Sequence, residues 1–192
     1  SIDNPPEEEK ETALEIIKFE KGTNKPLAGA IFEVKGPHGD VLGSFSTDMN
    51  GKITLPLTLS GTYIVAEKTA PKNYLLSKDN TKTVTVSYNQ TATVTFANEP
   101  YGDLRIEKIG GVSGESLAGA QIEVKSLTDG TTYSGTTQTG GSLNLTELKP
   151  GAYEIKEIAA PKGYKLDDKT YTANVSTGEV TTVTLKNYAN PG

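Results

Sequence analysis

The 192-residue chain contains one internal repeat, and this repeat constrains its fold more than any other feature of the sequence. Leu27-Ala28-Gly29-Ala30 recurs as Leu117-Ala118-Gly119-Ala120, and the pattern Glu67…Ala70-Pro71…Tyr74 recurs between Glu157 and Tyr164. Both pairs are 90 positions apart, and only near the end of the chain does the offset become 89. Solenoid repeats are shorter, at about 20–45 residues. The repeat therefore predicts two independently folded domains in series.

The junction between these domains is marked by Glu99-Pro100-Tyr101-Gly102, where Pro and Gly interrupt the strand-like pattern. We therefore expect the first domain to cover residues 11–100 and the second to cover residues 101–192. Residues 1–10 contain the run Pro5-Pro6-Glu7-Glu8-Glu9-Lys10 and are expected to form an extended leader.

Within each repeat the sequence favours short β-strands. Thr, Val, Ile and Tyr are frequent, and 20 Gly and 10 Pro supply turns between the strands. Alternation of apolar and polar residues between turn signals is typical of a sandwich or barrel. The predicted fold class is all-β, with two tandem small antiparallel β-sandwich domains. The expected strands lie near residues 13–20, 30–35, 41–46, 52–55, 61–68, 82–88 and 91–98, and then near 103–109, 120–126, 131–135, 142–145, 151–158, 169–175 and 179–187.

The composition excludes several classes of function. Without Cys the chain has no disulfide and no thiolate ligand or nucleophile, and its one histidine, His38, is expected in a solvated loop. The run Asp48-Met49-Asn50-Gly51 lacks the spacing of a calcium loop and is expected to form a turn, so we predict no metal and no cofactor. The net charge of −5 argues against a nucleic-acid partner, and no run of 18 apolar residues indicates membrane insertion.

Polar residues interrupt the apolar face of three expected strands in each repeat. Residues i, i+2 and i+4 of a strand share a face. The face that begins with Leu14 and Ile16 therefore ends in Lys18, and the fifth and last strands end in the same way in Glu and Asn. The faces are Leu14/Ile16/Lys18, Tyr63/Val65/Glu67 and Val94/Phe96/Asn98 in the first repeat, and Leu104/Ile106/Lys108, Tyr153/Ile155/Glu157 and Val183/Leu185/Asn187 in the second.

Three inward polar residues in one small core need one another as partners. An unpaired buried charge costs several kcal/mol, although a single Lys at a strand end more often reaches solvent. The pattern occurs twice with matching spacing, because Lys and Glu are 49 residues apart in both repeats and Lys and Asn are 80 and 79 apart. We therefore expect two buried trios, formed by Lys18, Glu67 and Asn98 and by Lys108, Glu157 and Asn187.

These motifs resemble the Cna B-type domain family of Gram-positive surface proteins. The segment from Tyr63 to Tyr74 is similar to the family pattern Tyr-x-hydrophobic-x-Glu-x-x-Ala-Pro-x-Gly-Tyr, and the segment from Tyr153 to Tyr164 matches it in full. The first repeat departs at Asn73, where Gly is usual, but Asn also tolerates positive φ. The resemblance covers nearly all of residues 12–100 and 103–189 and implies a prealbumin-like, reverse-immunoglobulin β-sandwich.

In that family, the Lys and the Asn form a spontaneous intramolecular isopeptide bond, assisted by the Glu. The resemblance therefore implies a Lys18–Asn98 bond with Glu67 as the catalytic residue, and a Lys108–Asn187 bond with Glu157. Burial disfavours charged side chains and so favours a nucleophilic amine. We expect a protonated Glu to hydrogen-bond the carboxamide oxygen and to pass a proton to the departing ammonia. Each domain reacts once, so we do not expect a turnover enzyme.

The resemblance also implies a function outside the cell. We expect a stalk or pilin-type segment of a cell-surface adhesin, anchored to the cell wall of a Gram-positive bacterium by a part of the protein beyond these residues. Its partners would be neighbouring domains of the parent protein, with any host matrix ligand bound through other domains. We expect the fragment itself to be a monomer.

Other functions remain open. The domains would instead bind a matrix protein or a glycan if Tyr88, Tyr101 and Tyr133 were exposed stacking residues. A sortase-polymerised pilin subunit needs a donor Lys and a sorting motif, and these residues contain no such motif. A glycosidase with paired carboxylates is disfavoured, because Glu67 and Glu157 lie in different repeats and no second inward carboxylate is evident.

Overall fold

The computed structural model describes residues 11–191, so the leader expected over residues 1–10 lies outside the described residues. The described residues form fourteen strands, without helices, and separate after Pro100 into two compact units. The prediction of two tandem all-β sandwich domains is confirmed. Within residues 11–191, the structure has no helix long and apolar enough to span a membrane.

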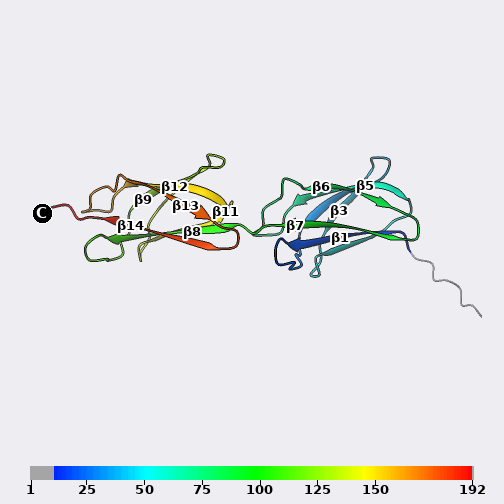
Figure 1. Cartoon of the computed structure of the whole chain (residues 1–192), viewed down its shortest axis with the longest axis horizontal. Coiled ribbons are helices and arrows are strands. Elements are labelled where there is room, and N and C mark those ends of the chain that lie inside the picture. Colours follow the sequence, from blue (N-terminus) through cyan, green and yellow to red (C-terminus); the bar gives the residue numbers. More distant parts are fainter. Residues whose placement is uncertain (1–10, 192) are drawn as a thin grey trace, which may run out of the picture. The chain divides into compact units, whose positions relative to one another are not determined.

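The first unit consists of a three-stranded sheet, in the order β4-β1-β7, and a four-stranded sheet, in the order β3-β2-β5-β6 (Figure 1). Its strands are β1 (Ala13–Glu20), β2 (Ile31–Lys35), β3 (Val41–Ser46), β4 (Lys52–Pro56), β5 (Gly61–Thr69), β6 (Thr81–Val86) and β7 (Thr91–Asn98).

The second unit repeats this topology, with sheets β11-β8-β14 and β10-β9-β12-β13. Its strands are β8 (Gly102–Gly110), β9 (Gln121–Ser126), β10 (Thr132–Thr136), β11 (Ser142–Leu148), β12 (Gly151–Ala159), β13 (Thr170–Val175) and β14 (Val180–Asn187).

The first and last strands of each unit are parallel neighbours, unlike the other pairs. β1 pairs with β7 so that Glu20 lies opposite Asn98, and β8 pairs with β14 so that Gly110 lies opposite Asn187. Antiparallel strands can be joined by a tight hairpin, whereas parallel strands need a long connection. Here the connection is the rest of the domain, which the prediction of antiparallel sandwiches did not anticipate. The chain thus enters and leaves each unit along one adjacent strand pair.

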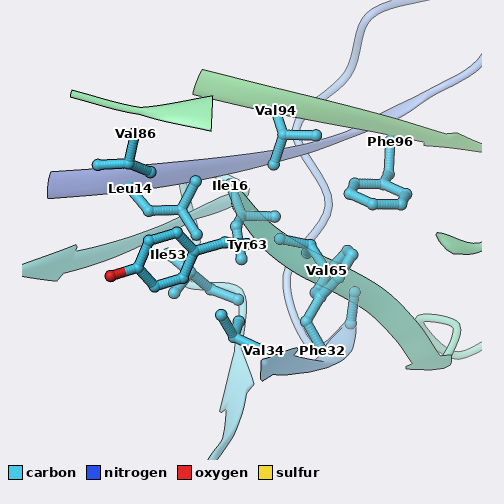
Figure 2. Close-up of a cluster of buried hydrophobic side chains, with 11 residues drawn as sticks. Leu14, Ile16, Phe32, Val34, Ile53, Tyr63, Val65, Val86, Val94 and Phe96 are labelled. Carbon is cyan, nitrogen blue, oxygen red and sulfur yellow. The ribbon is translucent and has the colours of Figure 1, made fainter. Parts of the chain in front are cut away.

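The core of each unit lies between its two sheets. In the first unit, side chains from β1 and β7 face those from β2 and β5 across the interior, and the rings of Phe32 and Phe96 meet edge to face with 4.8 Å between centroids (Figure 2). The second unit has Ile122 and Leu185 at the corresponding positions, and both are buried in its core. Because β-sandwich cores are filled by the inward residues of both sheets, the apolar faces inferred from alternation are the ones that are buried.

Two strand predictions differ from the structure by more than one residue. β6 ends at Val86 rather than 88 because a turn follows, with Asn89 at a φ of 59°. β11 continues to Leu148 rather than ending at 145 because a bulge resets its register on β8, with Glu147 at a φ of 57°. A bulge interrupts the two-residue period on which the prediction depended.

Candidate functional site

The three inward polar residues of the first unit lie at the ends of β1, β5 and β7. Lys18 and Asn98 come from adjacent strands of one sheet, and Glu67 comes from the opposite sheet, where it pairs with Phe32. All three side chains are buried, and Lys18 is fully enclosed. The alternation of β1 requires this, because Lys18 shares a face with two core residues that are also fully buried. The structure therefore places the three predicted residues together in the interior.

Glu67 bridges the other two members of the first trio. Its Oε2 lies 2.9 Å from Lys18 Nζ, and its Oε1 accepts a hydrogen bond from Asn98 Nδ2 at 3.0 Å. The Asn98 Nδ2 also donates to the carbonyl oxygen of Leu75 at 2.7 Å. The carboxamide oxygen of Asn98 has no hydrogen-bond partner among the described residues. The two acceptors therefore fix which end of the amide faces the carboxylate.

This amide orientation differs from our expectation. We expected a protonated Glu to hydrogen-bond the carboxamide oxygen, whereas the nitrogen faces Glu67 in the first unit and Glu157 in the second. The reason is the backbone carbonyl beside each carboxylate, since an NH₂ group has two donors and can satisfy two acceptors at once.

The second unit has the same trio at the ends of β8, β12 and β14. Lys108 Nζ lies 3.2 Å from Glu157 Oε1, and Asn187 Nδ2 donates to Glu157 Oε2 at 2.8 Å and to the carbonyl oxygen of Lys165 at 2.9 Å. Glu157 Oε2 also accepts a hydrogen bond from the backbone N–H of Asp167 at 2.6 Å. The two trios thus share one plan and differ in one backbone donor.

Burial changes the protonation balance of the first trio. Desolvation lowers the pKa of Lys18, and the hydrogen bond and negative charge of Glu67 oppose this effect only in part. A lower pKa increases the fraction of Lys18 that is a neutral amine at a given pH. The neutral amine is the nucleophilic form of lysine. The site can therefore supply a nucleophile beside a carboxamide, with a carboxylate in contact with both.

The remaining sequence candidates lie outside these sites. Tyr88 is exposed, but Tyr101 is half-buried and Tyr133 packs against the second core, 6.5 Å from the Tyr153 ring. Tyr101 and Tyr133 therefore do not form the exposed stacking surface considered above. His38 is exposed in a loop. Among residues 11–191, no cluster of three His, Cys, Asp or Glu side chains is arranged to hold a metal ion.

The Asp48 run forms a turn, as its sequence indicated. Asp48 Oδ1 accepts hydrogen bonds from the backbone N–H groups of Asn50 and Lys52, at 2.9 and 3.0 Å. This carboxylate oxygen is therefore used in stabilising the turn.

Sequence reasoning missed the backbone groups of both trios. The carbonyls of Leu75 and Lys165 and the N–H of Asp167 act irrespective of side-chain identity, so no residue pattern identified them. The only available signal was positional, because both carbonyls directly follow the Tyr that ends the repeated Ala-Pro-x-x-Tyr motif.

A family model described as the SpaA prealbumin-like fold domain matches the chain twice, over residues 12–100 and 102–189. The chain belongs to this family. Its two SpaA prealbumin-like domains coincide with the two structural units, and the resemblance to domains of Gram-positive surface proteins is confirmed.

Relatives of the two SpaA prealbumin-like domains include proteins of streptococci and staphylococci. The chain is 28% identical over 149 residues to the trypsin-resistant surface T6 protein of Streptococcus pyogenes serotype M6, and covers 28% of its length. It is 25% identical over 161 residues to the serine-aspartate repeat-containing protein F of Staphylococcus epidermidis, covering 9% of that protein. These matches take in 67% and 73% of this chain. The chain thus spans only a small part of either curated relative.

Solved structures support the same fold. The streptococcal ancillary pilin aligns with a TM-score of 0.52 and 23% identity, over 94% of this chain and 63% of that one. The shaft pilin SpaA from Lactobacillus rhamnosus GG aligns with a TM-score of 0.54 and 13% identity, over 95% of this chain and 99% of that one. At these identities the comparisons establish the fold of the SpaA prealbumin-like domains.

Proposed function

We propose that each domain closes its fold with a covalent bond between Lys and Asn, and that the pair serves as a stalk segment of a Gram-positive surface protein. The observation that carries this proposal is the buried Lys–Glu–Asn trio, which occurs twice, with one carboxylate contacting both the amine and the amide nitrogen. The cross-links would be Lys18–Asn98 and Lys108–Asn187.

The reaction begins with a proton transfer within the buried ion pair. The Lys18 ammonium gives a proton to Glu67 Oε2, which leaves a neutral amine and a carboxylic acid, and the burial that lowers the pKa of Lys18 favours this neutral amine. Nζ then attacks Cγ of Asn98, so that the Nζ–Cγ bond forms and the Cγ–Nδ2 bond breaks. The amine loses its second proton as Nδ2 gains one, and ammonia leaves.

The amide orientation suits Glu67 to this proton transfer. Its Oε2 faces the attacking nitrogen and its Oε1 faces the leaving nitrogen, so one carboxyl group can take a proton from the first and deliver one to the second. Folding supplies the proximity, which in intramolecular reactions corresponds to effective molarities up to about 10⁵–10⁸ M. Glu157 has the same relation to Lys108 and Asn187. The carboxylate therefore acts as a proton shuttle between nucleophile and leaving group.

Ammonia needs a path out of the buried site. In the second domain, a cavity of about 380 Å³ includes Asn187 and Lys165 in its lining. This volume exceeds that of several water molecules. The cavity is a suitable exit for ammonia from the second domain.

The position of the bonds suits a load-bearing role. Force that enters at the start of β1 and leaves after β7 would cross from Lys18 to Asn98, and the strands between them would carry little of it. By the loop-entropy model for disulfides, closing a loop of about 80 residues contributes roughly 4–5 kcal/mol to stability. An amide also needs no oxidising environment, which suits a chain without Cys. Each domain would therefore resist pulling through one covalent link.

The relatives support a location at the cell surface. One is named a trypsin-resistant surface protein, and resistance to proteases is a property that covalent closure of a domain would give. We therefore propose an extracellular, wall-anchored parent protein, with neighbouring domains of that protein as partners. Each site reacts once, so the chain is a self-processing structural protein rather than a turnover enzyme.

The intact mass of the denatured chain tests this proposal. Each bond releases one ammonia, so we expect a deficit of about 17 Da per domain and about 34 Da in total. Glu157→Ala should halve the deficit. Glu179→Ala is a matched control, because it has the same composition but changes an exposed Glu of the same domain. A full-length wild-type chain with no mass deficit would overturn the cross-link proposal.

A further inference from the structure

In each domain a tyrosine from the loop after the fifth strand donates a hydrogen bond to a carboxylate near the end of the first strand. Tyr74 Oη donates to Glu20 Oε1 at 2.7 Å in the first domain, and Tyr164 Oη donates to Glu115 Oε1 at 2.5 Å in the second. The other oxygen of each carboxylate accepts a hydrogen bond from a hydroxyl group. The hydroxyl donors are Thr23 and Ser113.

The two carboxylates come from positions that do not correspond in the repeat. The two tyrosines are 90 positions apart, and so are the two hydroxyl donors. The carboxylates do not follow this offset. The first domain has Glu20 where the second has Gly110, and the second has Glu115 where the first has Lys25. These two positions face each other across one turn. The Glu20 N–H donates to the Lys25 carbonyl at 2.8 Å, and the Gly110 N–H donates to the Glu115 carbonyl at 2.8 Å. A carboxylate from either side of the turn therefore reaches the tyrosine.

Gly110 makes room for the carboxylate of the second domain. A Cβ atom at this position would lie 2.4 Å from Oε1 of Glu115, closer than atoms can approach. Compared with the first domain, the second therefore has a carboxylate, Glu115, in place of Lys25, and no side chain at Gly110, in place of Glu20. Two coordinated differences give the same contact as in the first domain, which indicates a role for the contact itself.

The tyrosine directly precedes the carbonyl group that orients the reactive amide. The Leu75 carbonyl accepts a hydrogen bond from Asn98 Nδ2, and the Leu75 N–H donates to the carbonyl of Glu99 at 2.8 Å. Lys165 makes the same two contacts, with Asn187 and with the carbonyl of Tyr188. Fixing the tyrosine therefore fixes the acceptor that turns the amide nitrogen toward the carboxylate.

We propose that Tyr74 and Tyr164 are positioning residues for cross-link formation, each held by its carboxylate so that the next carbonyl orients the asparagine. This inference rests on the proposed function and adds to it a device that acts through the backbone. Hydrogen bonds, first from Thr23 and then from Tyr74, lower the pKa of Glu20, and burial together with Glu20 raises the pKa of Tyr74 to about 12. The pair is therefore a neutral donor on a charged acceptor at neutral pH, which is the stronger kind of hydrogen bond.

The test follows cross-linking over time in a full-length chain with Tyr74→Phe. The chain is produced by cell-free translation, and samples of the reaction are quenched in denaturant at intervals. Intact mass gives the number of bonds, and peptide mapping assigns each bond to its domain. We expect the first domain to react about 3- to 10-fold more slowly, as the net contribution of one partly exposed hydrogen bond implies. The second domain of the same chain is an internal reference. Tyr88→Phe, which removes a hydroxyl from an exposed ring, is the matched control.

A transplant separates positioning from general stability. Glu20→Gly should slow the first domain as Tyr74→Phe does, and adding Lys25→Glu to it should restore the wild-type rate by rebuilding the arrangement of the second domain. Circular dichroism shows that the variants compared are folded. Folded Tyr74→Phe and Glu20→Gly chains that react at the wild-type rate would overturn the positioning role and leave the cross-link proposal intact. A wild-type chain without any mass deficit would overturn both.

Discussion

The two buried carboxylates differ in the donors that they receive. Glu67 accepts one side-chain N–H, from Asn98, whereas Glu157 accepts the equivalent one and also the backbone N–H of Asp167. The loops that carry this donor position also differ in length. Six residues, 75–80, separate the motif tyrosine from β6 in the first domain, and five, 165–169, separate it from β13 in the second. The shift of the repeat from 90 to 89 therefore changes an environment inside the protein.

This difference suggests that the two proposed reactions are not equally easy. A hydrogen bond to a carboxylate favours its charged form. The proposed reaction needs the opposite change, because the carboxylate must first take a proton from the lysine. The domain with the extra donor should therefore keep its ion pair longer. The first domain, whose carboxylate accepts one hydrogen bond fewer, should react first.

The largest expected effect comes from disabling one domain at a time. Glu67→Gln should remove the bond from the first domain only, and Glu157→Gln from the second only. Each unbonded domain should lose about 4–5 kcal/mol of stability, since its unfolded state is no longer a closed loop. Guanidinium unfolding should show one early transition in each variant, alongside a mass deficit of about 17 Da. Unchanged unfolding in both variants, despite the lost bonds, would contradict this expectation.

Exchanging the loops tests the kinetic difference directly. Residues 75–80 placed in the second domain, instead of 165–169, should separate the Asp167 position from Glu157 and speed bond formation about 10-fold. The reverse exchange should slow the first domain. Time-resolved intact mass with peptide mapping measures both rates in one chain. Equal rates in the wild-type chain and in both exchanges would show that the extra donor has no effect.

A smaller effect is expected at the turn that precedes each motif tyrosine. Asn73 has a φ of 73° and Gly163 a φ of 89°, so both lie in the left-handed region. A Cβ atom at Gly163 would meet no atom within 4 Å, so the cost of Gly163→Ala is conformational only. Gly163→Ala should destabilise the second domain by about 1 kcal/mol, and Gly163→Asn by less. Chemical unfolding measures both, with Asn73→Gly as the reciprocal change.

The smallest expected effect depends on pH and on one domain only. Hydrogen bonds from Thr131, first of all from its backbone N–H, lower the pKa of Asp129 from 3.8 to about 2. Its contribution to stability is therefore complete above about pH 4 and is lost as the pH falls through about 2. Asp129→Asn should lower the melting temperature of the second domain at pH 7 but not at pH 2. The first domain has Gly39 at this position and serves as the reference. Equal melting shifts at both pH values would contradict this assignment.

The sequence was sufficient to identify the polar side chains of the core because their signal is periodic. Lys18 follows two apolar residues on one face of a strand, and a lysine interrupts the corresponding apolar face in the second repeat. Comparing the repeats could not reveal the tyrosine contacts in the same way, because Glu20 and Glu115 occupy different positions. They are equivalent only in space, across a turn that the linear pattern does not display.

Backbone contacts were beyond sequence reasoning for a different reason. The N–H of Asp167 reaches Glu157 because of a loop length, and the parallel pairing of β1 with β7 depends on contacts about 80 residues apart. Neither is marked by a residue pattern that repeats in both domains. The bulge at Glu147 is similar, because a Glu at positive φ has no propensity that predicts it.

The parallel pairing of first and last strands also bears on the order of events during synthesis. A domain whose closing strand is its final segment cannot seal until that segment has left the ribosome, and contacts this distant in sequence form slowly. Under the proposed chemistry, each domain of the nascent chain therefore stays an unbranched thread until its last strand has been synthesised. Each domain becomes a covalent ring only after its whole length has emerged. The same topology that would resist extension in the finished protein would thus leave the unfinished one free to pass through a narrow pore.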